Sequence, residues 1–255
     1  EYGDAPEGVA AYPSLGITGS FPTCASCGPA GFIVHKNVDA YFGPSVDLEP
    51  DGNAGLCGPE SGIPYNSDEC FDDGDAGLIV PSPFTLKGNS FVACTGNGSE
   101  LGMATDTVNW GIDLDILVVN TTGQEVYVNL LIDWNQSGEW SLDPATKLWF
   151  DVVLPEHILV NLPVPPGYNG PVSALMPPSF ILPSTGGFHW ARFSVTETPV
   201  PDNWDGSGDF EQGETEDYVL FVANYSAIPV SNWALFIALG LMVAFTVLFW
   251  RRKMI

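Results

Sequence analysis

Residues 125–140 read EVYVNLLIDWNQSGEW. In the first half of this stretch, every second residue from Val126 to Ile132 is apolar, which is the pattern of a β-strand with one buried face. Five other stretches are strand-like as well, namely residues 112–120, 147–154, 157–162, 188–196 and 217–225. Six such runs joined by turn-rich links favour an antiparallel β-sandwich over residues 101–225.

The composition agrees with a mainly β fold. The 255 residues include 28 glycines and 22 prolines, which suits short strands joined by turns and argues against a helical bundle. Residues 1–100 are rich in Gly, Pro, Cys and Asp with little periodicity, so we expect a loop-rich, disulfide-braced region there. Residues 163–187 contain too many prolines for a central strand and predict a long surface excursion.

The second half of the opening stretch has the spacing of a calcium loop. Oxygen-bearing side chains recur at Asp133, Asn135 and Ser137, and a glycine follows at position 138. The Glu139 carbonyl and Asp143 are the candidates that would complete the coordination. An EF-type loop, however, has a bidentate Glu at its twelfth position, where this chain has proline. The alternative is a turn rich in Asx residues, in which Gly138 supplies a positive φ.

A second acidic stretch, residues 202–211, also alternates oxygen-bearing side chains. Its candidate calcium ligands are Asp205, Ser207 and Asp209, with Phe210 at the place where a calcium loop has glycine. Calcium is therefore the favoured candidate cofactor of this chain. Further acids lie at residues 47–51 and 68–75, and crowded carboxylates repel one another unless a cation or protons neutralise them.

All five cysteines lie in the first hundred residues. Outside the cytoplasm they should pair. Cys57 and Cys70 are the favoured pair, because their bridge would close a short loop and contribute roughly 3 kcal/mol in the chain-entropy model. Cys24 and Cys27 could bridge locally, or one of them could reach Cys94, and an odd count leaves one thiol over. A zinc site at Cys24 and Cys27 is the less favoured alternative.

The charge balance excludes nucleic acid as a partner. The chain has 31 acidic and 7 basic residues, and its formal net charge is −24. Three of the basic residues fall within residues 251–255. A surface this acidic repels phosphate backbones and would attract calcium or a basic partner protein.

Residues 233–250 predict a transmembrane helix. They read WALFIALGLMVAFTVLFW, without charge or proline, and would span about 27 Å as a helix. Tryptophan stands at both ends and RRK follows directly, so we expect residues 251–255 in the cytoplasm, residues 226–232 as a linker, and the preceding domain in the periplasm or outside the cell. Because the chain begins at Glu1 without an apolar leader, we also expect that a signal peptide has been removed.

Several stretches together resemble a known family. These are EYGDAPEGVAAYPSL at the start, FGPSVDLEPDGNAG, DECFDDGDAGL, LIDWNQSGEW, ARFSV, and GETEDYVLFV at residues 213–222. Their order resembles bacterial surface proteins with the GEVED domain, in which Thr215 would stand for the signature valine. The tail from Ile228 looks like an IPTL-type C-terminal sorting segment. The resemblance implies an extracytoplasmic β-sandwich without established catalytic activity.

The residues themselves give little support to catalysis. The three histidines, His35, His157 and His189, stand in unrelated contexts, and no nucleophile motif accompanies them. Among the signature acids Glu214, Glu216 and Asp217, one could pair with Arg192. The sequence therefore predicts a protein that is not an enzyme.

Two classes of function remain. The favoured one is an accessory or structural subunit of an integral membrane complex, for which respiratory and photosynthetic assemblies are natural hosts. Ala234 with Ala238, and Gly240 with Ala244, give the close-approach spacing for a neighbouring helix in the lipid bilayer. The alternative is a calcium-dependent adhesin or carbohydrate-binding module, whose contact residues would be exposed Trp134, Trp140 and Trp204.

Overall fold

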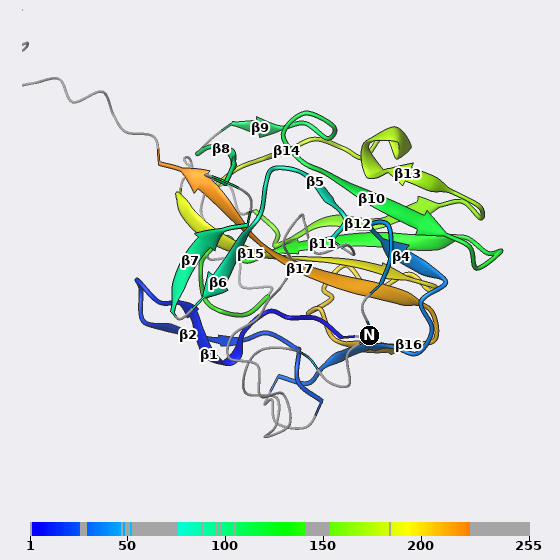
Figure 1. Ribbon diagram of the computed structural model, residues 1–255, viewed down its shortest axis with the longest axis horizontal. Coiled ribbons are helices and arrows are strands. Elements are labelled where there is room, and N and C mark those ends of the chain that lie inside the picture. The colour runs from blue at the N-terminus through cyan, green and yellow to red at the C-terminus, as the bar shows by residue number, and fades with distance from the viewer. Residues whose placement is uncertain are drawn as a thin grey trace, which may run out of the picture. The chain divides into compact units, whose positions relative to one another are not determined.

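Strand β11 (Val126–Ile132) belongs to the largest sheet of the computed structural model (Figure 1). The strand order of this seven-stranded sheet is β12-β11-β15-β17-β6-β7, and β8 pairs with β17 in parallel. Its other strands are β6 (Phe84–Lys87), β7 (Ser90–Ala93), β8 (Glu100–Met103), β12 (His157–Val164), β15 (Gly187–Thr196) and β17 (Gly213–Ala223). The longest pairing is antiparallel, between β15 and β17, and it places Arg192 opposite Asp217.

The structure describes residues 2–25, 30–46, 48, 52, 76–87, 89–94, 96, 98–104, 106–140, 154–183 and 185–224. Residues 1–224 form one compact unit and residues 225–255 another. The predicted anchor at 233–250, with its linker and tail, lies outside the described residues. Within them, no helix is long and apolar enough to cross a membrane.

A second sheet of four strands has the order β13-β10-β4, with β5 also paired to β10. Its strands are β4 (Ala40–Phe42), β5 (Leu78–Val80), β10 (Asp115–Asn120) and β13 (Asn169–Pro171), and a short 3-10 helix, η1 (Val172–Leu175), follows β13. Side chains of both sheets share one hydrophobic core. Phe42, Ile116 and Val118 of the smaller sheet pack there with Val128 of β11 and Phe193 of β15.

The other face of the large sheet is covered too. A second core joins Trp190 and Val219 of the large sheet to Tyr12, Phe21 and Ile33 of the N-terminal region. The covering strands are β1 (Glu7–Tyr12) paired with β2 (Ile17–Ser20), and β3 (Ile33–His35) paired in parallel with β16 (Gly208–Phe210). In Figure 1 the large sheet lies between these strands and the sheet that contains β10. Its central strands are therefore buried on both faces.

The prediction of a mainly β fold is confirmed. Strands β10, β11, β12, β15 and β17 lie at five of the six predicted stretches, and the alternate residues of β11 from Val126 to Ile132 all belong to the first core. The sixth stretch, 147–154, lies mostly outside the described residues. The proline-rich stretch 163–187 holds β13, η1 and β14 (Phe180–Ile181). The short strand β14 pairs with β9 (Thr107–Val108), which lies earlier in the chain.

The loop-rich, disulfide-braced region expected at residues 1–100 stays a prediction, because much of it lies outside the described residues. Its described part also holds strands that the sequence did not indicate, namely β1 to β7 and the start of β8. Strands β4 and β6 pair with β10 and β17, so this region contributes strands to both main sheets. The reason is that strands of three to six residues are too short to show a period of their own, and their partners are distant in sequence.

Candidate functional site

The densest polar cluster of the described residues is centred on Arg192 of β15. Its Nε donates to Asp217 Oδ1 at 2.8 Å, and its Nη2 donates to Asp217 Oδ2 at 2.5 Å. Both side chains are fully buried. Two parallel N–H···O bonds between a guanidinium and a carboxylate are the strongest form of this ion pair. The predicted pairing of Arg192 with one signature acid is therefore confirmed, and the acid is Asp217.

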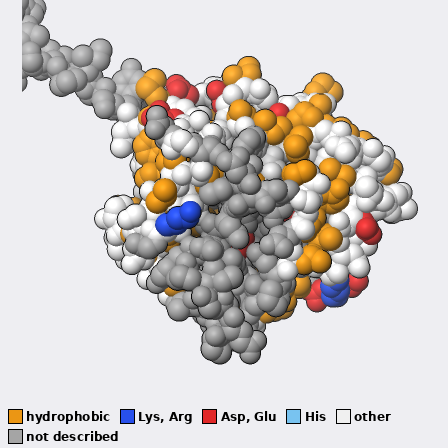
Figure 2. All heavy atoms as spheres, viewed as in Figure 1, with side chains coloured by type: hydrophobic (Ala, Val, Ile, Leu, Met, Phe, Trp, Pro, Cys, Tyr) orange, Lys and Arg blue, Asp and Glu red, His pale blue; other side chains and the backbone are white. Residues whose placement is uncertain are grey.

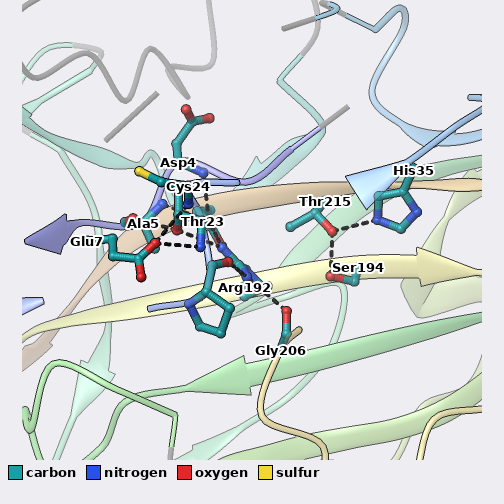
Figure 3. Close-up of polar contacts among 12 residues, drawn as sticks. Asp4, Ala5, Glu7, Thr23, Cys24, His35, Arg192, Ser194, Gly206 and Thr215 are labelled. Atoms are coloured by element: carbon teal, nitrogen blue, oxygen red, sulfur yellow. Dashed lines mark hydrogen bonds and ion pairs between the residues drawn. The ribbon is translucent and has the colours of Figure 1, made fainter. Parts of the chain in front are cut away.

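Nη1 of Arg192 binds backbone carbonyl groups from two other segments, and Nη2 also donates to the Thr23 hydroxyl oxygen at 3.4 Å (Figure 3). Nη1 donates to the Pro22 carbonyl at 2.6 Å and to the Gly206 carbonyl at 3.0 Å. The guanidinium carbon also lies 4.3 Å from the ring centre of Trp140, a cation–π contact. One buried cation thus binds the N-terminal segment, the loop before β16 and the end of the 133–140 stretch.

Asp217 holds the start of the chain. Its Oδ2 accepts hydrogen bonds from the backbone N–H groups of Asp4 and Ala5, each at 2.8 Å. A Cβ added at Gly3 would lie 2.3 Å from Arg192 Nη2 and 2.6 Å from Asp217 Oδ2, so only glycine lets the backbone approach the ion pair this closely. The N-terminal segment is therefore fitted to this ion pair.

A second buried carboxylate, Glu7 of β1, acts in the same way. Its Oε2 accepts from the N–H groups of Thr23 and Cys24, at 3.2 and 2.8 Å (Figure 3). Its Oε1 accepts from the N–H of Ala30 at 2.8 Å. Three backbone donors on one carboxylate satisfy its charge away from water. Glu7 therefore fixes the segment that follows β2.

The signature stretch at residues 213–218 points its side chains to alternate faces of the large sheet. Glu214 accepts a short hydrogen bond from the N–H of Phe42 in β4, and Glu216 accepts from the hydroxyl of Tyr218, which in turn accepts from the N–H of Gly77. These contacts lie on the side of the first core. Asp217 faces the N-terminal strands instead, so the signature residues bind both covering layers to the same strand.

The hydroxyl of Thr215 contacts two other buried polar side chains. Thr215 Oγ1 lies 2.9 Å from His35 Nε2 and 2.8 Å from Ser194 Oγ, and all three residues are buried (Figure 3). A Cβ added at Gly213 would lie 2.6 Å from His35 Nδ1, so glycine makes room for the imidazole. These three groups are the residue types of a nucleophile and a base, but burial keeps them from water and substrate.

The other two histidines are also buried and hydrogen-bonded. His189 lies 2.9 Å from the Asp133 carbonyl through Nδ1 and 3.2 Å from the Thr185 carbonyl through Nε2. Burial lowers the pKa of His189 to about 4 although both carbonyl groups favour the protonated ring. Burial likewise lowers the pKa of His35 to about 3 and lowers the pKa of His157. All three rings are therefore neutral near pH 7.

The 133–138 loop is closed by its own hydrogen bonds. Asp133 Oδ1 and Asn135 Oδ1 both accept from the N–H of Ser137, at 3.0 and 2.7 Å, and Asp133 Oδ2 accepts from the N–H of Gly138 at 2.8 Å. Gly138 has a φ of 85°, as the turn interpretation requires. Tyr12 of β1 also donates to Asp133 Oδ2, at 2.9 Å. Burial raises the pKa of Asp133 to about 6 despite these donors.

Neither predicted calcium set forms a cage among the described residues. In the first set the oxygens of Asp133 and Asn135 face amide hydrogens, the hydroxyl of Ser137 donates to the Glu139 carbonyl at 3.0 Å, and Asp143 lies outside the described residues. In the second set, Asp205 Oδ1 accepts from Ser207. Asp209 instead pairs with Lys36 at 2.8 Å. The described residues contain no group of three His, Cys, Asp or Glu placed to hold a metal.

Calcium binding at the 133–139 loop stays a prediction with a direct test. The full-length protein, treated with chelator and then supplied with millimolar calcium, should gain thermal stability if the ion binds the folded state; the gain is about 2.7 kcal/mol at a hundredfold excess over Kd. The Asn135→Ala variant should lose this gain. An unchanged melting temperature in both proteins would leave the hydrogen-bonded turn as the complete account of the loop.

The three tryptophans predicted as exposed contact residues are buried. Trp134 is 0% exposed, Trp140 4% and Trp204 7%. Trp134 packs in the first core, while Trp140 and Trp204 pack in the second. The burial of Trp140 and Trp204 was not expected, because nothing in the sequence indicates that the N-terminal strands cover this face of the sheet. These indoles are therefore core residues and not a binding surface.

The cysteine predictions fall largely outside the described residues. Cys24 and Cys94 are described, and both enter disulfide bonds. Cys27, Cys57 and Cys70 lie outside the described residues, so the favoured Cys57–Cys70 pair stays a prediction.

Sequence reasoning missed the role of the N-terminal residues. Glu7 and Tyr12 carry much of the buried network, yet neither was singled out as functional. A signal was present, because both belong to the opening stretch EYGDAPEGVAAYPSL on which the family resemblance rests.

Comparisons with protein-family models, with curated proteins and with solved structures found no match.

Proposed function

We propose that this chain is a non-enzymatic accessory or structural subunit of a multi-subunit membrane complex. Its domain before residue 225 would lie in the periplasm or outside the cell, and residues 233–250 would anchor it in the bilayer. In this proposal the two main sheets form a β-sandwich, the N-terminal strands are a covering layer, and disulfides brace that layer.

The observation that carries the proposal is that the reactive polar side chains are buried and hydrogen-bonded within the fold. The groups that could do chemistry, namely the signature acids, the histidines and Arg192, are buried and bonded to backbone groups or to one another. Such contacts rigidify a scaffold. These acids, the histidines and Arg192 thus hold the layers of the fold together, which suits a structural role.

The surface charge supports a protein partner. Apart from Arg251, Arg252 and Lys253, the chain has four basic residues against 31 acidic ones. Of these four, Arg192 is buried in its ion pair. On the face drawn in Figure 2, Lys and Arg side chains are few and separate from one another. A complementary partner would therefore be basic, or bridged through cations.

The alternative function, a calcium-dependent adhesin or carbohydrate-binding module, loses its proposed contacts. It relied on aromatic side chains exposed beside acidic loops, and the three tryptophans in question are core residues. It also relied on calcium, and the described residues contain no group of three His, Cys, Asp or Glu placed to hold a metal. The accessory-subunit proposal needs neither feature.

Native particle size tests the proposal. Membranes from the native cells, solubilised in a mild non-ionic detergent, should yield the chain in a particle much larger than its 27.3 kDa. A particle of monomer size would contradict the proposal, and glycan binding by that monomer would restore the adhesin.

A matched pair of variants sharpens this test. Gly240→Leu with Ala244→Leu enlarges the predicted close-approach face of the helix and keeps the helix apolar, so it should release the chain from the complex but not from the membrane. Met242→Leu with Thr246→Leu changes the opposite face and should leave the particle intact. Equal behaviour of the two variants would argue against helix packing as the means of assembly.

A further inference from the structure

An open pocket lies where β17 approaches its end. It has a volume of about 650 Å³ and is lined by Phe84, Phe188 and Phe221, and by residues 98–100. The ring centres of Phe188 and Phe221 lie 4.9 Å apart, those of Phe84 and Phe188 lie 5.0 Å apart, and those of Phe84 and Phe221 lie 6.1 Å apart. The volume is in the range of small-molecule sites.

The strand register builds this pocket. Phe188 of β15 is paired with Phe221 of β17, and Phe221 is paired on its other side with Glu100 of β8. Paired residues of neighbouring strands share a face of the sheet, so the two rings and the carboxylate form a row across three strands. Phe84 comes from β6, the antiparallel neighbour of β17.

The backbone of residues 98–100 forms the remaining wall of the pocket. Gly98 has a φ of 68°, and a Cβ added there would lie 2.4 Å from the Phe84 ring. Glycine thus lets residues 98–100 run directly beside the aromatic rings. All three phenylalanines remain half-buried, so their rings are not enclosed by the cores on which they border.

The lining selects a particular chemistry. Phenylalanine faces carry negative electrostatic potential but no hydrogen-bonding group, so they attract cations that do not need hydrogen bonds. Glu100 is exposed and adds a full negative charge at the pocket. A primary ammonium is strongly hydrated, and the three rings offer no hydrogen-bond acceptor to replace the water that it loses on their side of the pocket. A quaternary ammonium has an apolar surface and loses little hydration free energy when it enters the pocket.

We propose that this pocket binds a trimethylammonium group, which contacts the rings of Phe84, Phe188 and Phe221 and is neutralised by Glu100. The net charge of −24 raises the local concentration of such cations. The group has two ordinary sources: a free small molecule such as choline, and the headgroup of phosphatidylcholine.

The first experiment uses choline chloride as the probe. It is titrated into full-length protein in a maltoside detergent, with binding followed by calorimetry, and we expect a Kd of about 1 mM. The control ligand is the neutral alcohol in which a carbon atom replaces the quaternary nitrogen, and we expect it to bind at least tenfold more weakly. Equal binding of the two ligands, or no binding of choline, would overturn the proposal.

Variants locate the site. Glu100→Gln removes the charge at an exposed position and should weaken choline binding about fivefold, and Phe221→Leu should weaken it about tenfold. Glu125→Gln removes an exposed carboxylate before β11 and should leave the Kd unchanged. Because Glu100 is exposed, its variant should fold normally and keep the test valid even if Phe221→Leu does not. An unchanged Kd in Glu100→Gln would overturn the assignment to this pocket.

Vesicles distinguish the two sources. The full-length protein, held in nanodiscs of phosphatidylglycerol, is mixed with vesicles of phosphatidylcholine or of phosphatidylglycerol. Cosedimentation with phosphatidylcholine alone, lost in Glu100→Gln, would assign the lipid headgroup. Binding of choline without cosedimentation would assign the free molecule, and failure of both would refute the proposal.

Discussion

The Arg192→Met variant is expected to lose about 3–5 kcal/mol of the free energy of unfolding, the usual cost of removing one partner of a buried ion pair. Methionine fills part of the space but leaves the Asp217 carboxylate buried without its counter-ion. The Pro22 and Gly206 carbonyl groups lose a donor as well. The contact with Trp140 loses its cation. For a chain of this size, the loss corresponds to a melting temperature lower by roughly 6–20 °C.

Thermal unfolding of the full-length protein in detergent, followed by circular dichroism, measures this effect. The matched control is Lys36→Met, which removes a cation that is about half exposed and lies 2.8 Å from Asp209 and 2.7 Å from Glu211. Exposed pairs contribute little, so this control should change the melting temperature by no more than about 4 °C. Similar effects of the two variants would contradict the structural role assigned to the Arg192–Asp217 pair.

Asp217→Asn separates charge from hydrogen bonding. The amide keeps one oxygen that can accept from Asp4 or Ala5, while it loses the charge that pairs with Arg192. We therefore expect the N-terminal segment to become more sensitive to protease at temperatures where the large sheet stays folded. If the N-terminal segment and the large sheet became sensitive to protease at the same temperature, the N-terminal layer and the large sheet would unfold as one unit.

The long strands could be predicted from the sequence because their signal is local. Apolar residues at every second position from Val126 to Ile132 predicted β11, and the same reasoning located β10, β12, β15 and β17. The strands of the first hundred residues could not be predicted in this way. β3 and β4 have three residues each, and their burial depends on β16 and β10, which lie far along the chain.

The candidate site was predictable only in part, for a related reason. Arg192 is one of only four basic residues outside residues 251–255, so its pairing with Glu214, Glu216 or Asp217 could be expected. The Asp133 and Asn135 spacing, in contrast, is compatible with both a metal loop and a hydrogen-bonded turn, and the sequence does not show that both side chains accept from the Ser137 amide. The burial of Trp134, Trp140 and Trp204 required knowledge that the large sheet is covered on both faces.

Acidification should destabilise the fold through its buried neutral histidines. The pKa of His35 is lowered from 6.5 to about 3, and that of His189 from 6.5 to about 4, with burial as the largest cause in both. Below pH 6.5 the unfolded chain binds protons at these positions and the folded chain does not. Each histidine therefore contributes stability at neutral pH that is lost as the pH falls, at about 1.4 kcal/mol per pH unit.

Asp133 acts in the opposite direction. Its pKa is raised from 3.8 to about 6, so its contribution is largest below its unfolded pKa and is lost as the pH rises through 6. Between pH 6.5 and pH 4, the two histidines outweigh the single carboxyl group. We expect the free energy of unfolding to fall by about 4 kcal/mol over this range.

Denaturant unfolding of the full-length protein at a series of pH values measures this slope. His35→Gln and His189→Gln should each reduce the slope by about 1.4 kcal/mol per pH unit, whatever they do to stability at neutral pH. Asp133→Asn should steepen it between pH 4 and pH 6, because it removes the opposing group. The slope, and not the stability itself, distinguishes titration from packing. If both histidine variants kept the original slope, the rings would have to be charged in the folded protein, and the assignment of His35 and His189 as buried neutral groups would be wrong.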